Sequence, residues 1–487
     1  MHETLTARTL RGAAWISGAS VARLALRVVS VAILARLLTP HEYGVVAGAL
    51  IAMDFAAMIY GMGLAPTLVQ RRELRPDHVA TAFFSALFVA VLAAVGMWFA
   101  APLIADLLQI SQLTQILKVL AWFTPLGAFS VLCEALLARN MLVKRVALRP
   151  LLSFTISTFL VAIPLAWYGF GYWSLVAQQA VDLVVTAATL GFAARKLLVR
   201  PRFSRRAFAE LWPVSLGFTI NQPFSYLTYN ADRVIIGRVL GAATLGVYTR
   251  ASFFASTAAT LFTNIARLSL FPAMAKIQQD TERLGNALLK SFSVLALVTL
   301  PASAFCVIFA PELVDLLLGE MWHQAVAPFA ILSGTLYFTL AWRNCTALFQ
   351  ALARPYWITT VQICRAAALI AGVWWIAPHG LTAICAVIGL VAASMLGIIL
   401  IIVKYAIDLP LRRVAAAHFQ PLVVTAATSA LCLTVKALLP ELPGPALVIF
   451  TLLLLLSSLC VFVFLNQERV FGSQGILALN RPRIGRR

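Results

Sequence analysis

The sequence predicts an all-α integral membrane protein of about fourteen transmembrane helices. Two observations predict this class. Hydrophobic residues make up 61% of the 487 residues and charged residues only 11%, with a mean hydropathy of +0.91, so the polar surface is too small to cover a soluble globule of this size. In addition, apolar runs of about 20 residues or more, long enough to cross a hydrocarbon core of about 30 Å, follow one another along the chain.

These apolar runs give the expected spans in order. The seventh run is interrupted by prolines and polar residues such as Pro213, Pro223 and Asp232. Broken helices of that kind are tolerated only where protein or a water-filled cavity satisfies the freed backbone groups. The expected spans are residues 12–38, 43–69, 80–108, 113–138, 147–168, 172–194, 207–239, 244–270, 286–309, 324–350, 356–377, 381–403, 414–437 and 444–466.

Basic residues fall in every second segment between the spans. The intervening segments are poor in them, and the segment 311–323 instead carries Glu312, Asp315 and Glu320. Because lysine and arginine are enriched in cytoplasmic loops, this alternation places both termini in the cytoplasm and supports an even number of spans. The same placement accounts for the net charge of +20 without a nucleic-acid partner.

A short segment occurs twice along the chain, which suggests two related lobes. Six spans separate the copies, and an even number gives parallel repeats related by an axis along the membrane normal. We therefore expect an N-terminal six-helix lobe at 1–200, a C-terminal six-helix lobe at 201–405, an extra helix pair at 406–466 and a basic cytoplasmic tail at 467–487. The residues Ile33, Arg36, Leu38, Gly44 and Val45 recur, in this order and spacing, as Ile235, Arg238, Leu240, Gly246 and Val247.

No catalytic or metal-binding pattern is present in the sequence. The chain contains no HExxH, no Gly-x-Ser-x-Gly and no P-loop, so we expect neither an enzyme nor a cofactor. The seven cysteines are scattered singly in apolar runs, as small buried residues would be. The first apolar run is longer than the core of a signal peptide and lacks a clear cleavage site, so we expect it to remain as the first span.

Arginines inside the apolar runs are candidate ligands for a phosphate group. A charged side chain near the bilayer centre costs about 2.5–3.5 kcal/mol on insertion scales, so it normally faces the bundle interior or a cavity. Arg23 and Arg27 lie one helical turn apart near the middle of the first span. Arginine is always charged and holds phosphate oxygens through two parallel hydrogen bonds. The candidates are Arg23, Arg27, Arg250, Arg343 and Arg365; the alternative is that each pairs with an intramembrane acid and only holds helices together.

Acidic residues inside the spans and charged residues near helix ends complete the candidate set. Asp54, Asp182 and Glu134 would act either as a proton or cation relay or as ion-pair partners of the arginines. Arg36 and Arg238 occupy the same place in both copies of the repeated segment, at the outer ends of their helices. With Asp232, they would form either structural helix ends or a gate between the lobes, because terminal arginines often only reach to the interface.

Two parts of the chain resemble a known family. RGAAWISGASVARLALRVVSVAILARLLTPHEYGVVAGAL with GMGLAPTLVQRRELRPDHVATAFFSALF, and later YNADRVIIGRVLGAATLGVYTRASFF with LFPAMAKIQQDTERL, resemble the two halves of Wzx-type oligosaccharide-lipid flippases. These are lipopolysaccharide, capsule and exopolysaccharide translocases of the MATE-like multidrug/oligosaccharidyl-lipid/polysaccharide superfamily. The resemblance covers about residues 8–405.

The resemblance implies a flippase of the bacterial inner membrane that moves undecaprenyl-diphosphate-linked sugar repeats by alternating access of two lobes. It implies that the central arginines hold the diphosphate, and that the partners are the lipid-linked oligosaccharide, membrane lipid, and polysaccharide polymerase and export proteins. The last two spans resemble an extra pair that, in some relatives, shapes a lateral groove for the lipid tail. The sugar, the polymer pathway, the coupling ion and the oligomeric state are left open.

Two other classes of protein are alternatives. A cation-coupled multidrug exporter of the same fold would favour an acidic or aromatic cavity, because its substrates are usually cationic, and the deep arginines count against it. A membrane polysaccharide polymerase or glycosyltransferase would be an enzyme with a large non-cytoplasmic loop that carries its acids or arginines. The expected outer loops of this chain are short.

Overall fold

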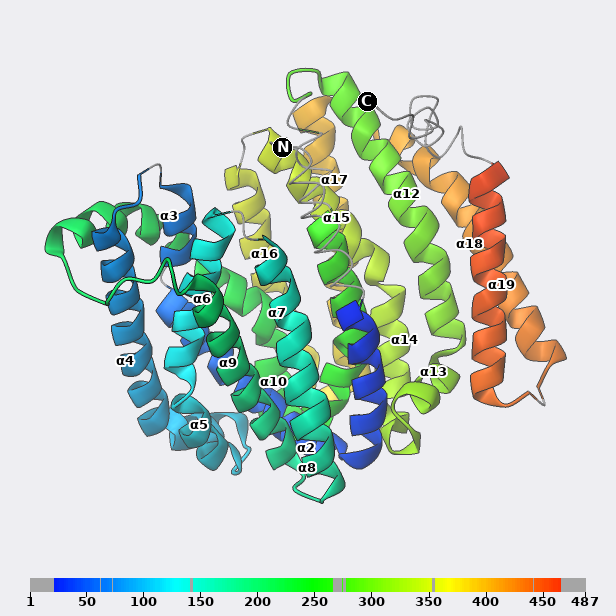
Figure 1. Ribbon diagram of the computed structural model, residues 1–487. Coiled ribbons are helices and arrows are strands. Elements are labelled where there is room, and N and C mark those ends of the chain that lie inside the picture. Colours follow the sequence, from blue (N-terminus) through cyan, green and yellow to red (C-terminus); the bar gives the residue numbers. More distant parts are fainter. Residues whose placement is uncertain are drawn as a thin grey trace, which may run out of the picture. The chain divides into compact units, whose positions relative to one another are not determined.

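The computed structural model is built from helices, and no strand occurs in the part of the chain that it describes (Figure 1). The predicted all-α class is therefore confirmed. A helix over residues 22–37 opens the described part. The described residues are 22–61, 63–71, 73–140, 143–265, 274, 277–352, 355–440 and 442–465.

The chain forms two compact units, each described here by itself. Unit 1 comprises Met1–Arg250, Leu317–Trp322 and Leu369–Leu381. After the helix at 22–37 its helices are α2 (Pro40–Gly61), α3 (Leu64–Gln70), α4 (Pro76–Leu108), α5 (Leu113–Ala121), α6 (Thr124–Arg139), α7 (Val143–Thr155), the π-helix η1 (Ile156–Ala162), α8 (Ile163–Trp167), α9 (Tyr172–Ala194) and most of α10 (Arg205–Ile265).

Unit 2 comprises Ala251–Leu316, His323–Ala368 and Thr382–Arg487. In this unit α18 packs along α12, and α19 is the neighbour of α18 (Figure 1). The extra helix pair is thus packed against the body of unit 2. From α12 onward the helices of the chain are α12 (Thr281–Ile308), α13 (Ala310–Leu317), η3 (Glu320–Ala325), α14 (Val326–Gly334), α15 (Leu336–Ala351), α16 (Pro355–Ile376), η4 (Ala377–His379), α17 (Leu381–Ile407), α18 (Leu411–Leu438) and α19 (Gly444–Leu465).

Ten helices of the described part are long and apolar enough to cross a membrane, or eleven if α5 and α6, which are bent by 49°, form one span. The chain is thus a multi-pass membrane protein, and the number fourteen stays a prediction. The seventh expected span and residues 244–265 of the eighth lie in α10, which continues through Pro213 and Pro223 and leaves helical geometry at Gly241 (φ 82°, ψ 177°); residues 266–270 lie outside the described part. The acidic segment 311–323, expected as a loop, is largely helical, because it contains most of α13 and the start of η3.

The turn before α2 is fixed by a capping box. The Thr39 backbone N–H donates to Glu42 Oε2 at 2.7 Å, and the Glu42 N–H donates to Thr39 Oγ1 at 3.3 Å. This reciprocal pair satisfies two backbone donors that a helix start leaves without a partner. It sets the position at which α2 begins and therefore the place of Tyr43 and Gly44 one turn later.

The two copies of the repeated segment contact each other in unit 1. A Cβ on Gly44 would lie 1.6 Å from the Ala242 carbonyl oxygen, and a Cβ on Gly246 would lie 1.8 Å from the Pro40 carbonyl oxygen. Pro40 and Ala242 also occupy equivalent positions in the two copies, so the contact is reciprocal. Only glycine fits at either position, because any side chain would overlap backbone of the other helix.

A tryptophan from the acidic segment packs beside this contact. Trp322 belongs to unit 1, is fully buried, and donates its indole N–H to the Ala35 carbonyl at 2.8 Å. Its ring meets Tyr43 edge-on, with the centroids 5.4 Å apart. A buried tryptophan with a satisfied N–H is well anchored, so it ties the acidic segment to the ends of the first two helices.

A polar cluster around Glu210 closes the basic end of unit 1. The Glu210 carboxylate forms ion pairs with Arg71 and Arg75 and is hydrogen-bonded to His78, whose Nε2 lies 3.0 Å from Oε2. Arg206, one turn earlier on α10, lies 3.4 Å away. The cluster joins the start of α10 to the segment between α3 and α4, which are far apart in sequence.

We expect Glu210→Gln to lower the apparent unfolding temperature of the purified protein by a few degrees, because it leaves several cationic partners without their carboxylate. Thermal unfolding followed by size-exclusion chromatography measures this. The control is Glu73→Gln, which neutralises an exposed carboxylate of the same segment. Equal unfolding temperatures for Glu210→Gln and the wild type would contradict a structural role for the cluster.

Candidate functional site

Three arginines from distant parts of the sequence gather in unit 1. Arg23 and Arg27 lie on the helix at 22–37, and Arg250 lies on the second part of α10. The charges of Arg23 and Arg250 both act on Arg27, which places Arg27 within electrostatic reach of each. Like charges that lie within electrostatic reach repel one another, and a bound anion relieves that repulsion. The arrangement is suited to a group with two or more negative charges.

Arg250 is positioned by an aromatic ring. Its guanidinium carbon lies 4.4 Å from the centroid of Tyr43, whose side chain is buried on α2. Stacking of this kind engages the face of the guanidinium, whereas its N–H donors lie along the edge. Tyr43 in turn packs against Trp322. The arginine is therefore held by the residues that line the contact between the repeated segments.

Acidic residues balance part of this positive charge. Asp182 on α9 acts electrostatically on Arg23, as does Arg149 on α7. Glu134 on α6 forms an ion pair with Arg149, with 3.3 Å between Oε2 and Nη2. Glu134 and Asp182 thus lie where ion-pair partners of arginines would be. Arg149 is not among the candidates because, with Arg139, Lys144 and Arg145, it belongs to a basic segment that is expected to be cytoplasmic.

A second group of charges surrounds Arg233 on α10. The charge of Arg233 acts on Asp54 of α2 and on the adjacent Asp232. Asp232 also accepts hydrogen bonds from the Tyr248 hydroxyl and, at 2.8 Å, from the Arg233 backbone N–H. The two acids thus share one cationic neighbour. Neither Arg233 nor Tyr248 is singled out by the sequence, since Arg233 meets Asp54 only when α10 is placed beside α2, and Tyr248 meets Asp232 from the other side of Gly241 in α10.

The arginines that recur in the two copies bind backbone carbonyls. Arg36 Nη1 donates to the Ala32 carbonyl of its own helix at 2.8 Å. Arg238 Nη1 donates to the carbonyls of Asp106 and Leu107, at 2.9 and 3.1 Å, where α4 ends. A cation at a helix C-terminus is favoured by the helix dipole and by the free carbonyls there. Both arginines therefore contribute to helix ends beside the repeated segments.

The remaining candidate arginines belong to unit 2. Arg343 lies on α15 and Arg365 on α16. The Arg365 guanidinium carbon lies 5.9 Å from the ring centroid of Trp342. Their role as substrate ligands stays a prediction. The structure brings Arg23, Arg27 and Arg250 together and describes Arg343 and Arg365 in the other unit.

Across the described residues, no group of three histidine, cysteine, aspartate or glutamate side chains is arranged as metal ligands would be. Glu312, from the acidic segment, pairs instead with Lys436 of α18 at 2.7 Å. The Lys436 ammonium also donates to the Ile308 carbonyl at 3.0 Å. This carboxylate thus fastens α13 and the end of α12 to α18.

These features define a multi-pass, all-α membrane protein with a cationic cluster inside its first unit. A family model described as "Polysaccharide biosynthesis protein" matches residues 33–327, more than half of the chain. The chain belongs to this family. The resemblance to oligosaccharide-lipid flippases is thereby confirmed at the level of the family.

Individual relatives agree with this assignment. The chain is 30% identical to the succinoglycan biosynthesis transport protein ExoT of Rhizobium meliloti (strain 1021). The aligned 326 residues cover 67% of this chain and 66% of the relative. It is 26% identical over 329 residues to the lipopolysaccharide biosynthesis protein WzxC of Escherichia coli (strain K12), covering 66% of each. The chain thus spans slightly less than two thirds of the length of these relatives.

Among solved structures, the chain is similar to the lipid II flippase MurJ in an inward closed conformation, with a TM-score of 0.74. The match covers 95% of this chain and 100% of MurJ at 10% sequence identity. At that identity the likeness concerns the fold. It agrees with the all-α membrane architecture predicted from the sequence.

Proposed function

We propose that this protein is a flippase that moves a polyprenyl-diphosphate-linked oligosaccharide from the cytoplasmic to the outer leaflet of the bacterial inner membrane. The observation that carries the proposal is the gathering of Arg23, Arg27 and Arg250 within one unit of a member of the polysaccharide biosynthesis protein family. The names of the relatives, which include a succinoglycan biosynthesis transport protein, support transport for surface polysaccharide synthesis.

The chemistry of the arginine cluster favours a diphosphate. A diphosphate carries several anionic oxygens on two adjacent centres, and each guanidinium can hold two of them in parallel. Arg23 and Arg27, one turn apart on one helix, present two such groups on the same side of that helix. Arginines 343 and 365 of unit 2 are included in the proposed substrate-binding set.

The transport step follows from the nature of the substrate. The diphosphate and sugars must cross the apolar core inside the protein, whereas the polyprenyl chain is apolar and stays in lipid. The two lobes would alternate access to the two sides of the membrane around the bound head group. The driving force would be a proton or cation passing through Asp54, Asp182 or Glu134, or the membrane potential, worth about 2.3 kcal/mol per charge per 100 mV.

The two other classes of protein fit less well. A cation-coupled multidrug exporter would place its cationic substrate beside three arginines. A polymerase or glycosyltransferase would need catalytic acids in its outer segments, and Glu312 of the acidic segment is paired with Lys436. The expected position of both termini in the cytoplasm, and cooperation with a polymerase and export proteins, belong to the same proposal.

The double variant Arg23→Gln/Arg27→Gln tests the site. We expect it to slow translocation by at least about tenfold, because a hydrogen bond to a charged group is worth about 1.5–3 kcal/mol and tenfold corresponds to about 1.4 kcal/mol. In cells that lack the wild-type protein, the variant should accumulate lipid-linked oligosaccharide on the cytoplasmic side and lose surface polysaccharide.

The matched control for this experiment is Lys196→Gln/Arg200→Gln, which also removes two positive charges, from exposed residues of the segment before α10. It should export normally at equal expression. Normal export by Arg23→Gln/Arg27→Gln would remove these arginines from the site. An unchanged lipid-linked pool after deletion of the whole protein would overturn the flippase function itself.

A further inference from the structure

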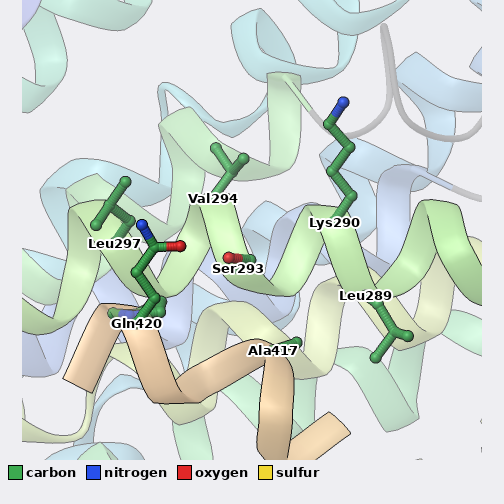
Figure 2. Close-up of a pocket in the computed structure, with 8 residues that line it drawn as sticks. Leu289, Lys290, Ser293, Val294, Leu297, Ala417 and Gln420 are labelled. Carbon is green, nitrogen blue, oxygen red and sulfur yellow. The ribbon is translucent and has the colours of Figure 1, made fainter. Parts of the chain in front are cut away.

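A cavity of about 310 Å³ lies between α12 and α18 of unit 2, and none of the candidate arginines lines it (Figure 2). Polar and apolar side chains share its wall. On the α18 side, Figure 2 shows Gln420 directed toward α12, where Ser293 lies. The lining residues are Leu289, Lys290, Ser293, Val294 and Leu297 of α12 and Ala417, Gln420 and Pro421 of α18.

The cavity lies at the border between the basic ends of the two helices and their apolar parts. One turn nearer the helix starts, Arg413 Nη2 donates to Asn286 Oδ1 at 2.8 Å. The starts of both helices carry exposed basic residues, Arg283 and Arg412, which the alternation of charge assigns to the cytoplasmic side. From Ser291 onward α12 is almost entirely apolar. This is the depth at which lipid head groups meet acyl chains.

The flanks of the cavity face lipid. Phe419 is 71% exposed, and Leu422 and Val298 are exposed on either side. Polar groups open to hydrocarbon cost several kcal/mol each unless they have a partner. Pro421 lies inside α18 and has no N–H, so it cannot donate the usual helix hydrogen bond to the Ala417 carbonyl, four residues earlier. This carbonyl is a further polar group at the cavity. An occupant of this cavity must therefore be polar at one end and apolar at the other.

We propose that the cavity binds an anionic phospholipid of the cytoplasmic leaflet. The Ser293 hydroxyl and the Gln420 amide supply donors for its phosphate, and Lys290, whose ammonium Figure 2 shows directed away from Ser293, adds a positive charge to the same wall. Leu289, Leu297 and their apolar neighbours contact the first methylenes of an acyl chain. Basic pockets between helices on the cytoplasmic side are suited to such head groups. The site would couple the extra helix pair to the composition of the membrane.

Native mass spectrometry of the purified protein with phosphatidylglycerol or phosphatidylcholine tests this proposal. The wild type should retain phosphatidylglycerol, and Lys290→Gln/Ser293→Val should retain at least about tenfold less, in line with the loss of a charged hydrogen bond. The control Lys404→Gln removes an exposed charge from α17 of the same unit and should bind as the wild type does. Gel filtration verifies that each variant is folded.

Three outcomes would overturn the phospholipid site. Equal retention by the double variant and the wild type would mean that the phospholipid binds elsewhere on the protein. Equal retention of both phospholipids would remove the role of charge. Retention of polyprenyl diphosphate but not phosphatidylglycerol would assign the cavity to the transported lipid. Because binding is measured without transport, these results do not depend on the flippase function.

The reciprocal glycine contact carries a second, independent inference. Gly44 and Gly246 lie inside helices with ordinary φ, where glycine is less favourable than alanine by about 1 kcal/mol. The close approach explains glycine here, since each Cβ would overlap a backbone carbonyl of the other helix. Glycine at both positions lets the two backbones pack directly against each other, and such a contact excludes solutes.

We infer that this contact, with Trp322 beside it, is the gate that closes the outer side of the pathway; this inference rests on the proposed flippase function. The contact joins one copy of the repeated segment to the other, so it lies where the two proposed lobes would part. Arg250 stacks on Tyr43 next to the contact. Separation of the copies would therefore also move one arginine of the substrate cluster relative to Arg27.

Gly44→Ala and Gly246→Ala test the gate, because either methyl would hold the two backbones apart. In a background without the native cysteines, Val247→Cys should react several-fold faster with a membrane-impermeant maleimide added outside when Gly44→Ala is present. The control is Gly96→Ala, whose Cβ would meet open space. Unchanged labelling in both glycine variants would overturn the gate. If labelling is faster, but cells that lack the whole protein have an unchanged pool of lipid-linked oligosaccharide, only the flippase function is overturned.

Discussion

The placement of cationic side chains inside an apolar helical unit is the constraint on which the rest of this structure depends. Each such charge is costly in a medium of low polarity, so the chain surrounds it with compensating groups. Asp182 lies near Arg23, and an aromatic face holds Arg250. The charges of Arg23 and Arg250 both act on Arg27. Positive charges gathered in this way suit an anionic substrate.

The duplicated segment links this cluster to movement. The equivalent glycines Gly44 and Gly246 each contact the backbone of the other copy. Tyr43, which directly precedes Gly44 on α2, lies against the guanidinium of Arg250. The residues that close one end of the unit are therefore the ones that position a substrate ligand. Trp322 adds a third element, because its indole joins the acidic segment to the same place. Closure and substrate binding share side chains in this account.

Much of the fold could be predicted from the sequence, because spanning helices are encoded locally in runs of apolar residues. The repeat also was visible, since Gly44 and Gly246 stand in equivalent places. What could not be predicted was contact between distant segments. Nothing in the local sequence shows that Glu134 meets Arg149, or that Trp322 returns to the first helix.

Local signals predicted the helix breaks only in part. Prolines suggested a break in the middle of the seventh span, but prolines inside membrane helices are tolerated where neighbours satisfy the freed carbonyls. The break lies at Gly241, in the gap expected between the spans 207–239 and 244–270, and positive φ there is cheap only for glycine. The acidic segment was expected to be a loop because its carboxylates suggested solvent. In the structure Glu312 is paired, so a charged sequence there still supports helices.

The most direct test of the central claim is translocation in proteoliposomes by the purified protein, with polyprenyl substrates that carry the same sugar through a diphosphate or through a neutral link. The account predicts fast movement of the diphosphate form, little movement of the neutral form, and loss of that preference in Arg23→Gln/Arg27→Gln. Equal rates for the two substrates with the wild-type protein would contradict recognition of the diphosphate by the arginine cluster.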